Sequence, residues 1–207
     1  MTVPILILAG GASVRMGARH KLLEEVQGQP LLRLQAWRAL KASREVTVLI
    51  RPGQPQIKRA LAGLPVRILT APEAFEGMGG SIRAGTRAHL RAKCFLMMLA
   101  DLVEIEASDL RKLIAARSTE SGPWIWRGAT EDGRAGHPIL FERAVYGELL
   151  NSRGDVGARN VLEMHPDRVR LVPLEGNRAV TDLDTEEDWD AWRAQQMQPS
   201  QADTETP

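Results

Sequence analysis

The segment that decides the fold comprises residues 3–17, VPILILAGGASVRMG. Residues 3–8 form a continuous aliphatic run, which predicts a strand buried on both faces of a parallel sheet. Gly10 and Gly11 follow at once, where glycine lets the chain turn tightly and approach a ligand. Because open α/β sheets bind ligands at the carboxyl ends of their strands, this loop is the first candidate binding site.

Outward from this segment, strand-like and helix-like stretches alternate along the chain, which indicates an α/β fold. Further strands are predicted at residues 45–50, 66–70, 94–99, 124–126, 138–141 and 169–174. Helices are predicted at about 31–40, 57–64, 81–93, 110–114, 145–150, 157–164 and 189–192. We therefore expect a single doubly wound, mostly parallel sheet flanked by helices. It would occupy residues 1–194, and the polar residues 195–207 would form a disordered tail.

The composition fits one globular domain and argues against several classes of protein. Of 207 residues, 43% are hydrophobic and 26% charged, and the net charge is only +1. A near-neutral chain is not expected to coat nucleic acid. The apolar runs fall short of the ~20 residues that a membrane span needs, and no basic residue precedes the first run. We expect a cytoplasmic protein with no membrane or nucleic-acid partner.

Charge is unevenly distributed around the first loop. Residues 12–21 carry Arg15, Arg19 and Lys21 without an acid. Backbone N–H groups of a glycine-rich turn can cradle an anion, and Arg15 and Lys21 can neutralise its phosphates. The glycine spacing fits neither a Walker A loop nor a dinucleotide fingerprint. A glycine-rich turn with solvated cations is the alternative interpretation.

Acidic residues supply candidate metal ligands. Asp101 follows the predicted strand 94–99, at the same sheet edge as the first loop, where a carboxylate can hold Mg²⁺ against a triphosphate. Residues 181–190 carry six acids and no base, and either Asp182 or Asp184 is a candidate second ligand. Both Asp101 and the acidic segment also have a purely structural interpretation. Asp101 can form a turn, and residues 184–188 can cap the last helix.

A second glycine-bracketed segment covers residues 154–159, GDVGAR, and lies downstream of His137. If it leads into a helix, the N–H groups at the helix start can receive an anion, with Arg159 reinforcing them. An ordinary helix start capped by Asp155 is the competing interpretation.

Residues 6–32, LILAGGASVRMGARHKLLEEVQGQPLL, resemble the signature of the molybdenum-cofactor nucleotidyltransferases, the MobA and MocA groups. The similarity continues through EGMGGSIRAG at 76–85, Asp101, residues 136–138, 154–159 and 182–185, and fades past about Ala194. The resemblance implies a Rossmann-like domain of the nucleotide-diphospho-sugar transferase type. Such a domain joins CMP or GMP to molybdenum-bound molybdopterin and releases pyrophosphate.

The resemblance also implies roles for individual residues. Residues expected to contact the nucleotide are Ala9, Gly10, Gly11, Ser13, Arg15, Lys21 and Ser81, of which Arg15 and Lys21 serve the phosphates. Asp101 and, less directly, Asp184 are implied as Mg²⁺ ligands, so that Arg15, Lys21 and Asp101 form the catalytic set. His137, Asp155 and Arg159 fall where the pterin-side acceptor is expected.

The chain departs from the family pattern after Asp101, and it combines features of the guanylyl and the cytidylyl groups. Val103 stands where the family often has proline, two residues after the metal-binding aspartate. The sequence Leu-Ala-Gly-Gly at 8–11 is typical of guanylyl enzymes, whereas the spacing from Gly17 to Lys21, Leu22-Leu23 and residues 154–159 resemble the cytidylyl group. The resemblance favours CTP over GTP.

Alternative functions remain open at this level. They are a guanylyltransferase, a related nucleotidyltransferase with another phosphorylated acceptor, and a non-catalytic chaperone that delivers cofactor to a recipient molybdoenzyme. The presence of both Lys21 and Asp101 favours catalysis over a chaperone. A Rossmann dehydrogenase is disfavoured by the glycine spacing.

Overall fold

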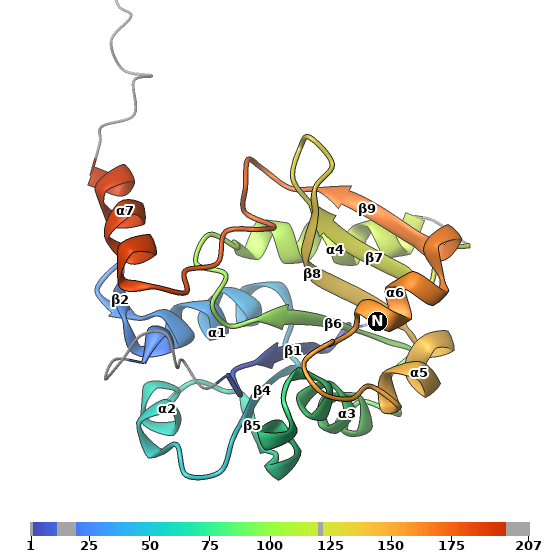
Figure 1. Cartoon of the computed structure of the whole chain (residues 1–207), viewed down its shortest axis with the longest axis horizontal. Coiled ribbons are helices and arrows are strands. Elements are labelled where there is room, and N and C mark those ends of the chain that lie inside the picture. The colour runs from blue at the N-terminus through green and yellow to red at the C-terminus, as the bar shows by residue number, and fades with distance from the viewer. Residues whose placement is uncertain (1, 12–19, 120–121, 198–207) are drawn as a thin grey trace, which may run out of the picture.

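The computed structural model describes residues 2–11, 20–119 and 122–197 and shows a seven-stranded sheet with helices on both faces (Figure 1). The strand order is β5-β4-β1-β6-β8-β7-β9. The strands are β1 (Ile5–Leu8), β4 (Val46–Ile50), β5 (Arg67–Thr70), β6 (Cys94–Leu99), β7 (Ile125–Ala129), β8 (Ala135–Glu142) and β9 (Val169–Pro173). Within this sheet only β8 runs antiparallel to its neighbours. The predicted doubly wound, mostly parallel α/β fold is confirmed.

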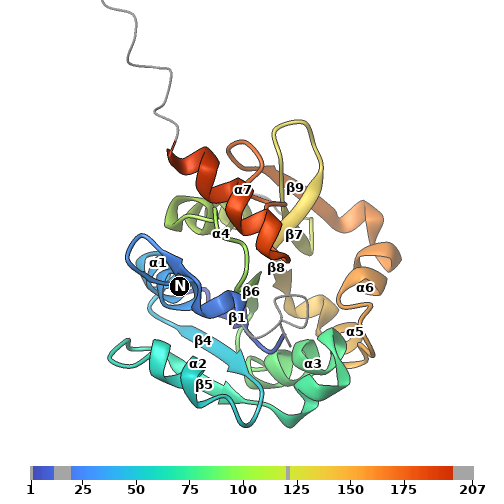
Figure 2. The same ribbon diagram turned by 60° about the vertical axis from the view of Figure 1, so that its left-hand side comes forward.

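Strand β1 is buried on both faces, which explains its unbroken aliphatic sequence. Ile5 and Ile7 join the core beneath α1 (Leu31–Ala42), α2 (Pro55–Ala60) and α4 (Ala107–Thr119). Leu6 and Leu8 join the core on the opposite face, beneath α3 (Met78–Ala88), α5 (Tyr146–Leu150) and α6 (Arg159–Met164). Figure 2 shows the two helical layers from a second direction. Alternate side chains of this one strand therefore belong to the hydrophobic cores on the two faces of the sheet.

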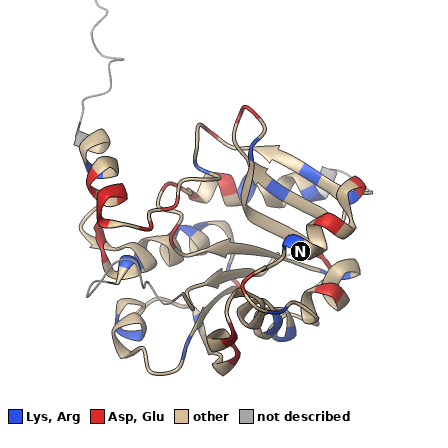
Figure 3. Ribbon diagram, viewed as in Figure 1, with Lys and Arg blue, Asp and Glu red and all other residues tan. Residues whose placement is uncertain are grey.

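The last helix, α7 (Glu186–Met197), packs through Trp189 on a small third cluster with Leu183 and Val103. Its start is fixed by a capping box, in which Thr185 Oγ1 accepts from Asp188 N at 3.1 Å and Asp188 Oδ2 accepts from Thr185 N at 2.9 Å. Acidic residues are concentrated along α7 and the segment that leads into it (Figure 3). The helix extends three residues into the tail predicted from residue 195, and residues 198–207 lie outside the described part.

A short hairpin of β2 (Glu25–Val26) and β3 (Gln29–Pro30) was not predicted from the sequence. Its turn residues, Gln27 and Gly28, both adopt positive φ, at 53° and 76°. Hairpins of this kind usually carry Asn-Gly or Asp-Gly, so Gln-Gly gave little signal. Among the described helices, none is long and apolar enough to span a membrane.

Helix α3 lies against the short 3₁₀ helix η3 (Pro72–Glu76) so closely that one helical position requires glycine. A Cβ built on Gly80 would overlap the carbonyl oxygen of Glu73. By contrast, a Cβ on Gly147 in α5 would meet no atom within 4 Å. The two glycines therefore make a matched pair of helical positions.

We expect Gly80→Ala to lower the free energy of unfolding by about 1–3 kcal/mol, because the added methyl group overpacks the contact with η3. Gly147→Ala should leave stability unchanged or raise it by about 0.5–1 kcal/mol, since alanine favours helix over glycine. Urea unfolding of both variants measures the difference. Equal midpoints for the two would contradict the close packing of α3 on η3.

Candidate active site

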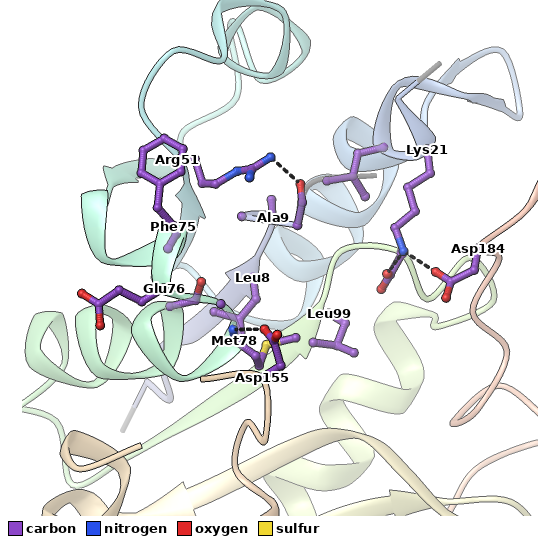
Figure 4. A pocket seen from close by; sticks show the side chains of 17 residues that line it. Leu8, Ala9, Lys21, Arg51, Phe75, Glu76, Met78, Leu99, Asp155 and Asp184 are labelled. Carbon is purple, nitrogen blue, oxygen red and sulfur yellow. Dashed lines mark hydrogen bonds and ion pairs between the residues drawn. The ribbon is translucent and has the colours of Figure 1, made fainter. Parts of the chain in front are cut away.

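A cavity of about 690 Å³ opens at the carboxyl edge of the sheet, over β1 (Figure 4). Seven of the residues expected to bind the nucleotide or the metal line it, namely Ala9, Gly10, Gly11, Lys21, Ser81, Asp101 and Asp184. Ser13 and Arg15 lie outside the described residues. We call this the first cavity.

The register of the two central strands explains how the loop and Asp101 meet. Leu8 of β1 pairs with Leu99 of β6, and Ala100 N donates to Leu8 O at 3.1 Å. The chain segments that follow the two strands therefore leave the sheet at the same level. Gly10 sits where a Cβ would crowd the Cβ of Ala74 at 3.1 Å and Ser81 Oγ at 3.2 Å, so glycine keeps the floor of the cavity open.

The ammonium group of Lys21 lies between two carboxylates. It donates to Asp101 Oδ2 through a short contact and to Asp184 Oδ1 at 2.7 Å. Burial by itself would lower the pKa of Lys21, but the charges and hydrogen bonds of Asp101 and Asp184 outweigh it and raise the pKa. Lys21 is therefore a permanent cation that joins η2 (Lys21–Leu23), the end of β6 and the segment before α7.

The acids around Lys21 have the character of a site for a divalent cation. Asp101 Oδ1 is buried and has no hydrogen-bond partner in the described part of the chain. Partial burial, followed by the charges of Asp101 and Asp184, raises the pKa of Asp182. Of the two candidates for the second carboxylate, Asp184 is the one that shares Lys21 with Asp101.

The described residues contain no group of three or more His, Cys, Asp and Glu side chains placed to hold a metal ion by themselves. Mg²⁺ commonly binds through one or two carboxylates and completes its shell with water and substrate phosphates. Asp101 and Asp184 fit such an ion if it arrives with a triphosphate.

Two residues of the first cavity were missed by sequence reasoning, Arg51 and Phe75. One terminal N–H of Arg51 donates to Gly11 O at 3.3 Å, and its guanidinium carbon lies 5.5 Å from the centroid of the Phe75 ring. Phe75 is 64% exposed, which is unusual for so large an apolar side chain. Arg51 directly follows β4, so the strand-end rule that identified Asp101 would also have found it.

A second cavity, of about 790 Å³, adjoins the first. His137, Asp155 and Arg159 all line it, so the structure brings the three predicted acceptor residues together. Met78, Leu99 and Asp155 line both cavities. The two spaces therefore meet beside the first turn of α3.

The segment 154–157 is fixed to the start of α3 rather than to its own helix. Asp155 Oδ1 accepts from Met78 N at 3.4 Å, and Gly79 N donates to Gly154 O at 2.7 Å. The cap of α6 is Ala158, without a side-chain hydrogen bond. The interpretation of Asp155 as the cap of the helix that follows it is therefore wrong. Its carboxylate binds the start of α3 and stands at the junction of the two cavities.

His137 lines the second cavity and is half-buried, with its Nδ1 atom fully buried. Burial, assisted by the positive charge of Arg127, lowers the pKa of its imidazole from the ordinary 6.5 to about 4. Its Nδ1 has no hydrogen-bond partner among the described residues. His137 is therefore neutral at pH 7 and presents an unpaired polar atom.

Lys21→Met should raise the affinity of the nucleotide-free protein for Mn²⁺ by about tenfold, equivalent to about 1.4 kcal/mol. The reason is that the variant removes the cation that competes with the metal for Asp101 and Asp184. Calorimetric titration measures the change, with the exposed Lys41→Met as the control. The same or weaker Mn²⁺ binding by Lys21→Met would show that these carboxylates do not form a metal site.

His137 should make stability depend on pH between about 6.5 and 4. In this range the unfolded imidazole binds a proton and the folded one does not, so unfolding takes up protons and stability falls as pH falls. The full loss is about 3 kcal/mol, from 1.36 kcal/mol per pH unit. Urea unfolding of the wild type and His137→Asn should give a difference that is flat above pH 7 and shrinks toward pH 4. A difference independent of pH would refute this assignment.

Comparisons with known proteins place this geometry in a family. Residues 5–169 match the model of the MobA-like NTP transferase domain. No curated protein sequence matches the chain. Among solved structures, Rv0371c from Mycobacterium tuberculosis H37Rv is 26% identical with a TM-score of 0.79, over 93% of this chain and 97% of that one.

Two further structures share the fold at lower identity. Rv0371c from the same organism, in complex with manganese, matches at 23% identity and a TM-score of 0.73, over 92% of this chain and 97% of that one. A nucleotidyl transferase from Methanothermobacter thermautotrophicus matches at 20% identity and a TM-score of 0.76, over 94% and 97%. Because the family model spans most of the chain, the protein belongs to the MobA-like NTP transferase family and is a nucleotidyltransferase.

Proposed function

We propose that the protein transfers CMP from CTP to molybdenum-bound molybdopterin, with Mg²⁺, and releases pyrophosphate during molybdenum cofactor maturation. The observation that carries this proposal is the pair of adjoining cavities, one over the glycine loop and one around His137, Asp155 and Arg159. Two substrates bound in them would meet at Met78, Leu99 and Asp155. A transferase of two bulky substrates needs this arrangement.

The first cavity suits a nucleoside triphosphate. Gly10 and Gly11 allow phosphates to approach the backbone, and Lys21 supplies positive charge beside them. Arg15, outside the described residues, is assigned to the same phosphates. Asp101 and Asp184 would hold Mg²⁺, which when bound offsets the charge that develops on the phosphates. Binding of the metal–nucleotide complex would require Lys21 to turn from the carboxylates toward phosphate.

Transfer needs positioning and electrostatic stabilisation more than proton transfer. A phosphate oxygen of the acceptor attacks the α-phosphorus in line, and the bond to the leaving pyrophosphate breaks. The attacking oxygen is already anionic near neutral pH, so we assign no general base. Lys21 stabilises the leaving group, and Asp155 orients the acceptor where the cavities join.

The second cavity suits a flat heteroaromatic acceptor. Its walls include apolar side chains such as Ile82, Met97 and Ile139, while Asp155 and the neutral His137 offer hydrogen bonds. A carboxylate accepts hydrogen bonds from N–H donors on a base edge, so Asp155 suits the amino-pyrimidine edge of a pterin. Arg159 would bind an anionic part of the same molecule.

Guanylyl transfer is the second candidate, and Arg51 is the observation that favours it. Its Nε is buried without a hydrogen-bond partner in the described part of the chain, and its guanidinium lies over Phe75 at the rim of the first cavity. Arginine is a frequent bidentate partner of guanine O6 and N7. Phe75 offers a stacking surface to either base.

Parallel assays with CTP and GTP, Mg²⁺ and molybdenum-loaded molybdopterin should release pyrophosphate, with CTP the better substrate. Asp101→Asn should lower turnover by about 10³-fold, because it weakens a carboxylate contact to the metal. The control is Asp167→Asn, an exposed position that lines neither cavity.

Near-normal turnover of Asp101→Asn at saturating Mg²⁺ would remove this residue from the catalytic set. Preferential turnover of GTP would replace cytidylyl with guanylyl transfer. Pyrophosphate release only with a different phosphorylated acceptor would overturn the assignment of molybdopterin.

A further inference from the structure

Arg127 lies in the second cavity, where neither the strand pattern nor the family resemblance assigned it a role. It projects from β7 and is half-buried. Its Nε donates to Gly136 O at 2.9 Å, and a terminal nitrogen donates to Ala135 O at 3.3 Å. Backbone carbonyls of β8 therefore fix the guanidinium in place while leaving its charge unneutralised.

Arg159 approaches the same cavity from the start of α6. Burial and then the charge of Arg159 lower the pKa of Arg127. Asp155 and Glu163 also line the cavity, yet in the part of the chain described here no carboxylate pairs with either arginine. Arg127 is half-buried and Arg159 is exposed, and two like charges that line one cavity repel each other unless an anion lies between them.

The cavity wall adds a buried polar atom that has no hydrogen-bond partner among the described residues. His137 Nδ1 is buried and unpartnered, and Arg127 is the charged neighbour that most favours its neutral form. The remaining lining is largely apolar, from Met97, Ile139 and Leu171 among others. The second cavity therefore holds two arginines without a paired carboxylate and the unpartnered Nδ1 of His137, whereas Asp155 stands at the junction with the first cavity.

We infer that Arg127 and Arg159 together clamp an anionic group of the acceptor that is separate from its reacting phosphate. The inference rests on the proposed function, in which the second cavity takes the acceptor. The reacting phosphate must reach the first cavity, which neither arginine lines. The substrate class is therefore an acceptor with an apolar or heteroaromatic body, a phosphate at one end and a second anionic group away from it.

Sulfate tests the clamp without any turnover. In ¹⁵N-labelled protein, the Nε–H signals of Arg127 and Arg159, assigned through Arg127→Lys and Arg159→Lys, should shift together with one Kd. Arg159→Ala should weaken that Kd for the Arg127 signal by about tenfold, the worth of one charge-assisted contact. The signal of Arg170, an exposed arginine on the neighbouring strand β9, should not follow the same curve.

Kinetics with the acceptor give a second readout. Arg127→Ala should raise the acceptor KM by about tenfold and leave the KM for the nucleotide unchanged, and Arg127→Lys should recover part of the loss. Arg170→Ala should change neither KM.

The sulfate titration and the acceptor kinetics together distinguish a failure of the clamp from a failure of the proposed function. A shared sulfate Kd without transfer to molybdopterin would keep the clamp and reject that acceptor. Transfer with no saturable sulfate shift, or with a shift that survives Arg159→Ala, would overturn the clamp and keep the function.

Discussion

The contact of the Lys21 ammonium group with Asp101 and Asp184 joins parts of the chain that are 80 and 163 residues apart. It ties the segment after the glycine loop to the end of the central strand and to the approach of the last helix. The side chains of Lys21 and Asp101 are only 13% and 18% exposed. The attraction between their opposite charges is therefore stronger than it would be in water.

In this structure Lys21 offsets the negative charge of Asp101 and Asp184. Under the proposed function, a metal that arrives with a triphosphate would bind the two carboxylates, and the lysine would then be free to contact the phosphates.

The first turn of helix α3 lies where the two cavities meet, and Met78 lines both of them. This turn is bound to the segment 154–157 through Gly79 and Asp155, while the later turns of the helix pack on β1 through Ile82. The two cavities therefore share the first turn of α3 at their junction. Because Asp155 lines both cavities, a shift of the segment 154–157 would alter the walls of both.

The sequence by itself determined the fold and which side chains stand at the ends of the central strands, because hydrophobic periodicity and strand ends are local signals. The aliphatic run of β1 indicated a buried parallel strand, and the position of Asp101 after β6 indicated the binding edge of the sheet. Arg51 follows β4 and could have been identified by the same reasoning. Only the tertiary structure decided that Asp184 joins Asp101 at Lys21 and that Asp155 binds the start of α3 and not that of α6. It alone revealed Arg127, since a charged residue inside a strand carries no local mark of the cavity it faces. Contacts between distant segments depend on how the helices and the sheet pack together. The spacing of residues along the chain does not reveal which distant side chains this packing brings together.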